Sequence, residues 1–254
     1  MVSLKELKEK VNGPGPEEHW RERAARYLSI RLTWILLNLF PKITPNQITI
    51  VMILFGFASA ALFMLGGYLY VLIGVFVYHL YLIVDACDGE VARYKRLFSK
   101  RGLYLDYLGH VLVNPLIIMS LAIGVFRHNP GLSTGIFKYN PFPNFPAWIF
   151  LLLGFIAFYF MVMNSMLKLK KYEMRIDKEE FDILKEKNIK HRESYNKKKR
   201  LVEEVFFFFR IMTFNSILVF GVLNMMNYLV ILYALIFPLE MLKRFYSEMK
   251  ECEN

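Results

Sequence analysis

Long apolar stretches alternate along the chain with short segments rich in basic residues. Six of these stretches each approach the roughly 20 residues that a helix needs to cross the hydrocarbon core of a bilayer. Their predicted bounds are 46–66, 69–88, 103–126, 146–167, 204–223 and 226–245. With 56% hydrophobic and 21% charged residues, the chain is also more apolar than an ordinary soluble domain. The pattern predicts an all-α integral membrane protein with six transmembrane helices.

The Lys and Arg residues lie almost entirely on one set of connections between the predicted helices. The N-terminal segment, the connections 93–101 and 168–201 and the C-terminal stretch 243–250 together hold 29 of them. The alternate connections hold only Arg127 and Lys138, and Arg210 lies inside a predicted span. Because basic residues favour the cytoplasmic side of a membrane, we expect both termini and both charged loops to face the cytoplasm. This topology accounts for most of the net charge of +10, and no aromatic and basic pattern of an RNA-binding surface competes with it, so we expect no nucleic-acid partner.

Residues 1–43 are predicted to form a cytoplasmic N-terminal segment. Charged residues open the chain and no small-residue cleavage site follows an apolar core, so we expect no secretory leader. Between Trp20 and Phe40, arginines alternate with aromatic and aliphatic residues, which is typical of an amphipathic helix lying in the membrane interface. A soluble cap helix is the alternative.

The transmembrane domain is predicted to cover 44–245. It opens with Thr44-Pro45-Asn46-Gln47, which supplies an N-cap hydroxyl, a proline in the first turn and a glutamine three residues after the cap. These are the parts of a capping box, so the first span is expected to start near Thr44. Asn114-Pro115 predicts a kink in the third span, because proline removes one backbone hydrogen bond of a helix.

The loop 168–201 and the tail 246–254 are both predicted to be cytoplasmic. The loop holds thirteen basic and seven acidic residues, and it is long for a connection between helices. It either selects the acceptor or closes as a lid over a neighbouring site, or it binds anionic lipid headgroups through its surplus positive charge.

Acidic residues concentrate where the second predicted span ends and the third begins. They are Asp85, Asp88, Glu90 and Asp106. A charged residue at the centre of a transmembrane helix costs about 2.5–3.5 kcal/mol on insertion scales, so such residues usually mark function. At about 100° per residue, Asp85 and Asp88 share a helix face with two small residues, Gly89 and Ala92. One helix face therefore offers two carboxylates with space beside them.

The third span places Gly102, Asp106 and His110 on one face, because they follow one another in steps of four. Helices joined by a short loop pack antiparallel, which would bring Asp85, Asp88 and Asp106 together. Three carboxylates repel one another unless protons or cations neutralise them, and hard oxygen ligands favour Mg²⁺ or Mn²⁺. The segment therefore predicts a metal site that accommodates a diphosphate. The alternative is that the acids only brace the helices against neighbouring basic residues.

These positions also form a recognisable signature. Asp85-Ala86-Cys87-Asp88-Gly89-Glu90-Val91-Ala92-Arg93 is followed after eight residues by Gly102, Asp106 and His110. The segment closely resembles the CDP-alcohol phosphotransferase signature, DxxDGxxAR-x8-GxxxDxxxD, at seven of its eight fixed positions. Thr44-Pro45-Asn46-x2-Thr49 resembles the segment that often opens the first helix of that family. The resemblance covers roughly 44–245, although after the signature only helix count and topology agree.

The resemblance implies a six-helix membrane enzyme, usually a homodimer, that transfers a substituted phosphoryl group from a CDP-alcohol to an acceptor hydroxyl and releases CMP. Chemistry would take place at the cytoplasmic interface. By the same resemblance, Asp85, Asp88 and Asp106 would bind Mg²⁺ or Mn²⁺, as two ions. The positions that hold or make room for the CDP moiety would be Gly89, Ala92, Arg93, Gly102 and Asn46.

His110 departs from the signature, which has an aspartate at this position. In the family that aspartate is taken to deprotonate the attacking hydroxyl and to complete the metal site. Neutral imidazole is an apt general base near neutral pH, so we expect His110 to be the catalytic base. It can instead ligate the metal, shifting preference toward Mn²⁺ or Zn²⁺. The histidine is also compatible with a subfamily that has another reaction, with an engineered replacement, and with a catalytically impaired relative that binds CDP-lipid and metal without turnover.

Membrane embedding favours a lipid donor of the CDP-diacylglycerol or CDP-archaeol type, used in phospholipid biosynthesis, whereas the pattern does not discriminate between acceptor alcohols. Lys168 and Arg210 are candidates for binding the acceptor. Lys168 can instead snorkel to the interface, and Arg210 can instead pair with Glu240. A divalent-cation transporter is a competing class, but the remaining spans carry few ionisable groups and offer no continuous polar pathway.

Overall fold

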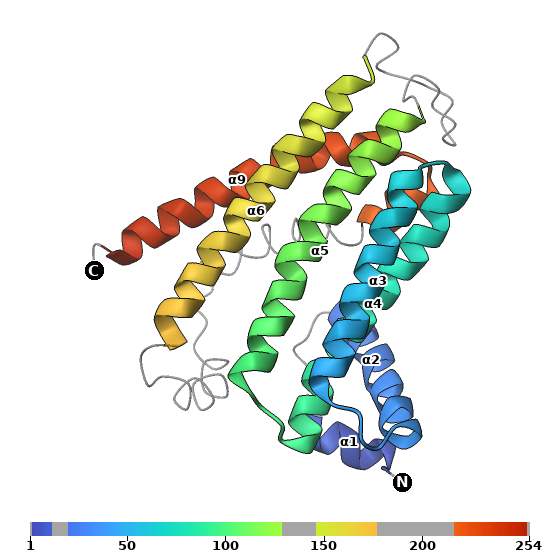
Figure 1. The fold of residues 1–254 in the computed structure, drawn as a ribbon, viewed down its shortest axis with the longest axis vertical. Helices are drawn as coiled ribbons and strands as arrows, with labels where there is room; N and C mark the ends of the chain where they lie inside the picture. Colours follow the sequence, from blue (N-terminus) through green and yellow to red (C-terminus); the bar gives the residue numbers. More distant parts are fainter. Residues whose placement is uncertain (1, 12–19, 129–145, 177–215, 253–254) are drawn as a thin grey trace. The chain divides into compact units, whose positions relative to one another are not determined.

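The computed structural model describes residues 2–11, 20–128, 146–176 and 216–252. Within these ranges the chain forms helices and short turns, with no strand (Figure 1). The chain divides into two compact units, Met1–Ser120 and Leu121–Asn254. The helices are α1 (Leu4–Val11), α2 (Trp20–Leu39), α3 (Pro45–Leu65), α4 (Tyr68–Lys95), α5 (Lys100–Arg127), α6 (Trp148–Ile176) and α9 (Met226–Cys252).

Five of the described helices are long and apolar enough to cross a membrane. They contain the segments Pro45–Leu65, Tyr68–Lys95, Lys100–Arg127, Trp148–Leu167 and Met226–Tyr246. These correspond to five of the six spans that the hydropathy pattern predicts, and they confirm an all-helical, multi-pass architecture. The remaining predicted span, 204–223, lies largely outside the described residues, although its end is helical at 216–222.

The start of α3 follows the predicted capping pattern. The backbone N–H of Thr44 donates to Oε1 of Gln47 at 2.9 Å, and Pro45 occupies the first helical position. Thr44 itself has an extended backbone, as an N-cap residue requires. The helix therefore begins at a defined residue, next to the predicted Thr44 cap.

The signature lies entirely on two helices, α4 and α5, because α4 continues to Lys95 instead of ending near 88. Arg96 then terminates α4 in the left-handed conformation at φ 56°, and the backbone N–H of Leu97 donates to the carbonyl of Ala92 at 3.0 Å. At the other end of the connection, Oγ of Ser99 accepts from the backbone N–H of Gly102 at 3.0 Å and caps α5. Only residues 96–99 therefore separate the two site helices.

The N-terminal helices pack against α4. Glu90 of α4 is 1% exposed and accepts hydrogen bonds from Ser29 Oγ at 2.5 Å and Thr33 Oγ1 at 2.6 Å, both on α2. These bonds replace the water that a buried carboxylate loses. The opposite face of α2 exposes the apolar residues Leu28, Ile35 and Leu39. Such a face suits the interfacial placement expected for this helix, which stays a prediction.

Helix α1 is held on the same side of α4. Leu7 is fully buried, and the hydroxyl of Tyr94 donates to Glu6 at 3.3 Å while the ammonium of Lys10 lies 4.8 Å from the centre of the Tyr94 ring. Lys10 also donates to Glu6 at 2.8 Å, and this hydrogen bond lowers the pKa of the Glu6 carboxyl. Apolar burial and surface polar contacts thus fasten α1 to the end of α4 that carries the signature.

Glycines allow α3 to approach its neighbours closely. A Cβ on Gly56 would overlap the fully buried side chain of Val113 on α5, and a Cβ on Gly109 would lie 2.8 Å from Cε of Met52. A Cβ on Gly74 of α4 would lie 2.9 Å from the ring of Phe63. Small residues at such crossings are typical of transmembrane helix packing. The close approach places α3, α4 and α5 around one set of polar side chains.

In the second unit, α6 packs along α9. The hydroxyls of Ser216 and Tyr233 lie 3.2 Å apart, and Arg244 Nη1 donates to the carbonyl of Asn164 at 3.4 Å. A Cβ on Gly154 would overlap Ala122, so α6 also approaches the end of α5 closely. The packing is apolar with a few polar contacts.

Gly56→Ala should destabilise the protein, because Val113 is stiff and cannot move aside. Overpacking of this kind costs about 1–3 kcal/mol, measured as the free energy of unfolding in detergent. Adding Val113→Ala removes the overlapping atoms, so the double variant should be more stable than the sum of the two single changes predicts. Strict additivity of the two changes would contradict a direct clash.

Candidate active site

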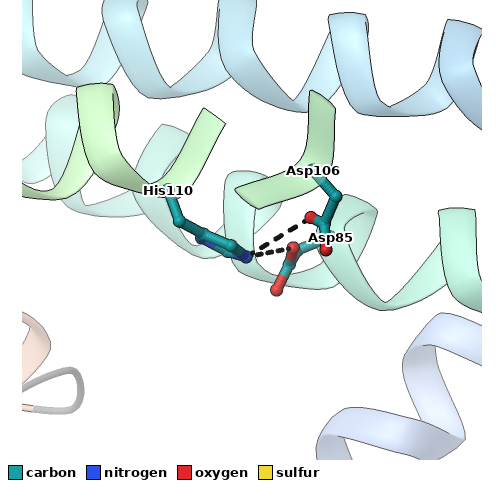
Figure 2. A group of neighbouring side chains, drawn as sticks. All are labelled: Asp85, Asp106 and His110. Carbon is teal, nitrogen blue, oxygen red and sulfur yellow. Dashed lines mark ion pairs between the residues drawn. The ribbon is translucent and has the colours of Figure 1, made fainter. Parts of the chain in front are cut away.

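Three side chains from α4 and α5 converge on one point (Figure 2). One ligand atom from each of Asp85, Asp106 and His110 lies within 4.8 Å of the others. Nε2 of His110 lies 3.1 Å from Oδ1 of Asp85 and 3.5 Å from Oδ1 of Asp106. The sequence predicts that these faces of the two helices meet. In the structure they do so at Asp85, Asp106 and His110.

The convergence follows from helix geometry. Asp106 and His110 lie one turn apart on α5, so both side chains project from the same face. Asp85 on α4 meets them from the other helix, and all three are about one-third exposed. The group is thus held by rigid helices and remains accessible.

His110 is also held through its other ring nitrogen. Nδ1 lies 2.9 Å from the hydroxyl of Tyr81, which donates in turn to Oδ1 of Asn114 at 3.1 Å. Tyr81 is fully buried. The sequence predicted no role for Tyr81, and it marked Asn114 only as part of a kink. The available signal was their spacing, since Tyr81 lies one turn before Asp85 and Asn114 one turn after His110.

Asp88 is buried and points to a third helix. Its Oδ2 accepts a hydrogen bond at 2.7 Å from Oγ1 of Thr49 on α3. Asp88 lies outside the group of three possible ligands, although it interacts electrostatically with Asp85 and Asp106. The Thr49 contact gives a structural reason for the threonine in the segment that opens α3.

The positions predicted to hold the CDP moiety form two pairs. A Cβ on Gly102 would lie only 2.7 Å from Oδ1 of Asn46, so the glycine allows the start of α5 to lie against this amide. A Cβ on Gly89 would lie 3.3 Å from Nη1 of Arg93, so the guanidinium lies over the glycine. Ala92 is half-buried on the same helix. Each glycine of the signature therefore adjoins a polar side chain, Gly89 that of Arg93 on α4 and Gly102 that of Asn46 on α3.

The side chains of the two predicted acceptor-binding residues lie outside the described part of the structure. Lys168 lies on α6, which continues to Ile176 instead of ending near 167, and the side chain of Lys168 lies outside the described residues. Arg210 also lies outside them, as does most of the predicted loop 168–201. The proposed pairing of Arg210 with Glu240 is therefore untested.

The three converging side chains fit a divalent cation. Two carboxylates and an imidazole are common ligands of Mn²⁺ and Zn²⁺, and carboxylates alone suit Mg²⁺. Oδ1 of Asp106 is buried with no hydrogen-bond partner among the described residues, so one lone-pair site remains to be satisfied. The donor atoms lie close enough to share one ion.

A comparison with protein families identifies the class of this protein. The family model for CDP-alcohol phosphatidyltransferase matches residues 42–240, so the chain belongs to this family. The match confirms the resemblance seen in the signature, and the family uses divalent metals. CDP-alcohol phosphotransfer within a membrane is the general activity that the family implies.

A relative in Archaeoglobus fulgidus is described as a bifunctional IPC transferase and DIPP synthase. It is 32% identical over 98 residues, which cover 39% of this chain and 19% of the relative. The matched segment is therefore a small part of that longer protein. It is consistent with the family but leaves the particular donor and acceptor unassigned.

Replacing one carboxylate should weaken metal binding. Because changes even to groups around metal ligands cost about 10–100-fold in affinity, Asp106→Asn should weaken Mn²⁺ binding at least about tenfold. Electron paramagnetic resonance of free Mn²⁺, titrated with purified protein in detergent, measures this affinity. Glu9→Gln, at an exposed carboxylate on α1, is the matched control and should bind as wild type. Equal affinities for all three proteins would rule out Asp106 as a ligand.

Proposed function

We propose that this protein transfers a substituted phosphoryl group from a CDP-linked lipid to an acceptor hydroxyl, with release of CMP. The observation that carries the proposal is the convergence of Asp85, Asp106 and His110 from the two signature helices. Membership of the CDP-alcohol phosphatidyltransferase family supports the same reaction class.

In the proposed reaction, the acceptor oxygen attacks the phosphorus that carries the donor alcohol. A new phosphorus–oxygen bond forms as the bond from that phosphorus to CMP breaks, and the hydroxyl proton must pass to a base. We assign this role to Nε2 of His110, which lies beside both aspartates and is accessible. CMP leaves with the electron pair of the broken bond.

A bound divalent cation would neutralise charge that develops on the diphosphate and the leaving CMP. Asp85 and Asp106 would hold it, with Nε2 of His110 as the alternative third ligand. Asp88, which keeps one carboxylate oxygen beyond its bond with Thr49, would contribute to a second ion. Arg93 and Asn46 would bind the nucleotide diphosphate, with Gly89, Ala92 and Gly102 leaving room for it.

The membrane spans support a lipid-linked donor of the CDP-diacylglycerol or CDP-archaeol type. The site belongs to helices that are themselves membrane spans, so a donor with acyl or isoprenoid tails reaches it from the bilayer. The basic connections support a cytoplasmic location for this end of α4 and α5. Glycerol phosphate, inositol phosphate, serine and lipid alcohols are the acceptors to be compared.

Purified protein with Mg²⁺ or Mn²⁺, CDP-diacylglycerol or CDP-archaeol and this acceptor panel should release CMP, measured by chromatography. Release that requires one particular acceptor would identify it. Mn²⁺ binding without CMP release across the panel would instead support a catalytically impaired relative that binds its ligands without turnover.

His110→Ala tests the assignment of the base. Removal of a general base should lower turnover by about 10²–10⁴-fold while Mn²⁺ and CDP affinities stay within a few-fold of wild type. Loss of Mn²⁺ affinity together with turnover would mark His110 as a ligand, and unchanged turnover would exclude both roles. His110→Asp, which restores the family residue, is the companion variant, since a large gain in turnover would show that the histidine impairs the enzyme.

A further inference from the structure

The surroundings of His110 extend beyond its contact with the aspartates. Each of its ring nitrogens has a partner of its own: Nε2 faces Asp85 and Asp106, and Nδ1 faces the hydroxyl of Tyr81. The rings of Tyr81 and His110 meet edge to face, with centroids 6.3 Å apart and an interplanar angle of 82°. The two contacts together leave the imidazole little freedom to turn.

A count of protons along this chain of hydrogen bonds fixes their direction. The phenol of Tyr81 has one proton, and it donates that proton to Oδ1 of Asn114, which can only accept. The oxygen of Tyr81 must therefore accept from Nδ1–H of His110, at 2.9 Å. In its neutral form the ring then has no proton on Nε2.

We propose that Tyr81 is a positioning residue whose hydroxyl, bonded to Asn114, fixes His110 as the Nδ1–H form. The fixed ring directs the lone pair of Nε2 at the point where the two aspartates meet, and only a proton or a cation can satisfy that point. The inference rests on the proposed function of the site but concerns side chains that no signature position includes. Histidines at metal sites are commonly held in this way, with the second ring nitrogen donating to an oxygen.

The rest of the surroundings support a fixed position for Tyr81. Its ring is fully buried and stacks on Tyr78, one turn earlier on α4, with centroids 5.8 Å apart and planes 22° apart. Asn114 lies on α5 directly before Pro115, which remains inside the helix. The pair therefore links α4 to α5 one turn farther into the span than Asp85 and His110.

Nitrogen-15 NMR of histidine-labelled protein in detergent tests the assignment directly, because protonated and unprotonated ring nitrogens have well-separated chemical shifts. The chain has five histidines, and loss of a signal in His110→Asn identifies the relevant one. As the pH is raised without metal, Nε2 should be the nitrogen that loses its proton, while Nδ1 keeps its own. Tyr81→Phe should give a mixture of the two neutral forms, whereas Tyr78→Phe, which removes a neighbouring hydroxyl on the same helix, should behave as wild type.

The second readout follows from the result for His110→Ala. If that variant loses Mn²⁺ affinity, so that Nε2 is a ligand, Tyr81→Phe should weaken Mn²⁺ binding about 10–100-fold relative to Tyr78→Phe, as loss of a group that orients a metal-binding histidine does. If His110→Ala keeps its Mn²⁺ affinity and loses only turnover, Tyr81→Phe should lower kcat for CMP release relative to Tyr78→Phe and leave Mn²⁺ binding unchanged. If the ring keeps both protons over the accessible pH range, this comparison decides the proposal. Equal thermal midpoints for the two variants would exclude a general loss of stability as the cause.

The proposal is overturned if Nδ1 loses the proton in wild type, which would mean that Asn114 presents its NH₂ group to Tyr81. It is equally overturned if Tyr81→Phe changes neither the ring signals nor the property, Mn²⁺ affinity or turnover, that His110→Ala loses. A wild-type protein that releases no CMP would instead defeat the proposed function, and the NMR result on His110 would still stand. The two failures are therefore distinguishable.

Discussion

Each acidic side chain of α4 needs a polar partner where it lies, because carboxylates on a membrane helix are wholly or partly withdrawn from bulk water. The structure meets this constraint three times along one helix, each time with a different partner helix. Asp85 meets His110 of α5, and Asp88 meets Thr49 of α3. Glu90 accepts hydrogen bonds from two hydroxyls of α2. Helix α4 is thus the shared partner of the first unit, and the polar contacts that organise its packing are the same ones that present the site.

Hydrophobic pattern and spacing predicted a large part of this arrangement. Long apolar runs locate the spans because every backbone polar group in lipid must be satisfied within a helix. Steps of three and four residues place Asp85, Asp106 and His110 on faces that can meet, and the capping residues at Thr44 set the start of α3. These features depend on local periodicity, which a single sequence displays directly.

Contacts between segments far apart in the sequence were not predictable in the same way. Ser29 and Thr33 look like ordinary residues of an amphipathic helix, and nothing in their spacing indicates that they bind Glu90. The direction of Asp88 toward Thr49 depends on how closely α3 and α4 approach, which small residues such as Gly74 permit. The predicted ends of two helices were wrong, because hydropathy marks only where the apolar stretch stops. Helices α4 and α6 continue past it into charged residues, to Lys95 and Ile176.

The short connection at 96–99 has a consequence for how the protein is made. Arg96 closes one helix and Ser99 opens the next, so the three converging side chains belong to a single helical hairpin. Contacts of small sequence separation form quickly, because little chain entropy is lost in closing the intervening loop. During synthesis, this group of three side chains can therefore assemble as soon as the hairpin has entered the bilayer, before the C-terminal helices have left the ribosome.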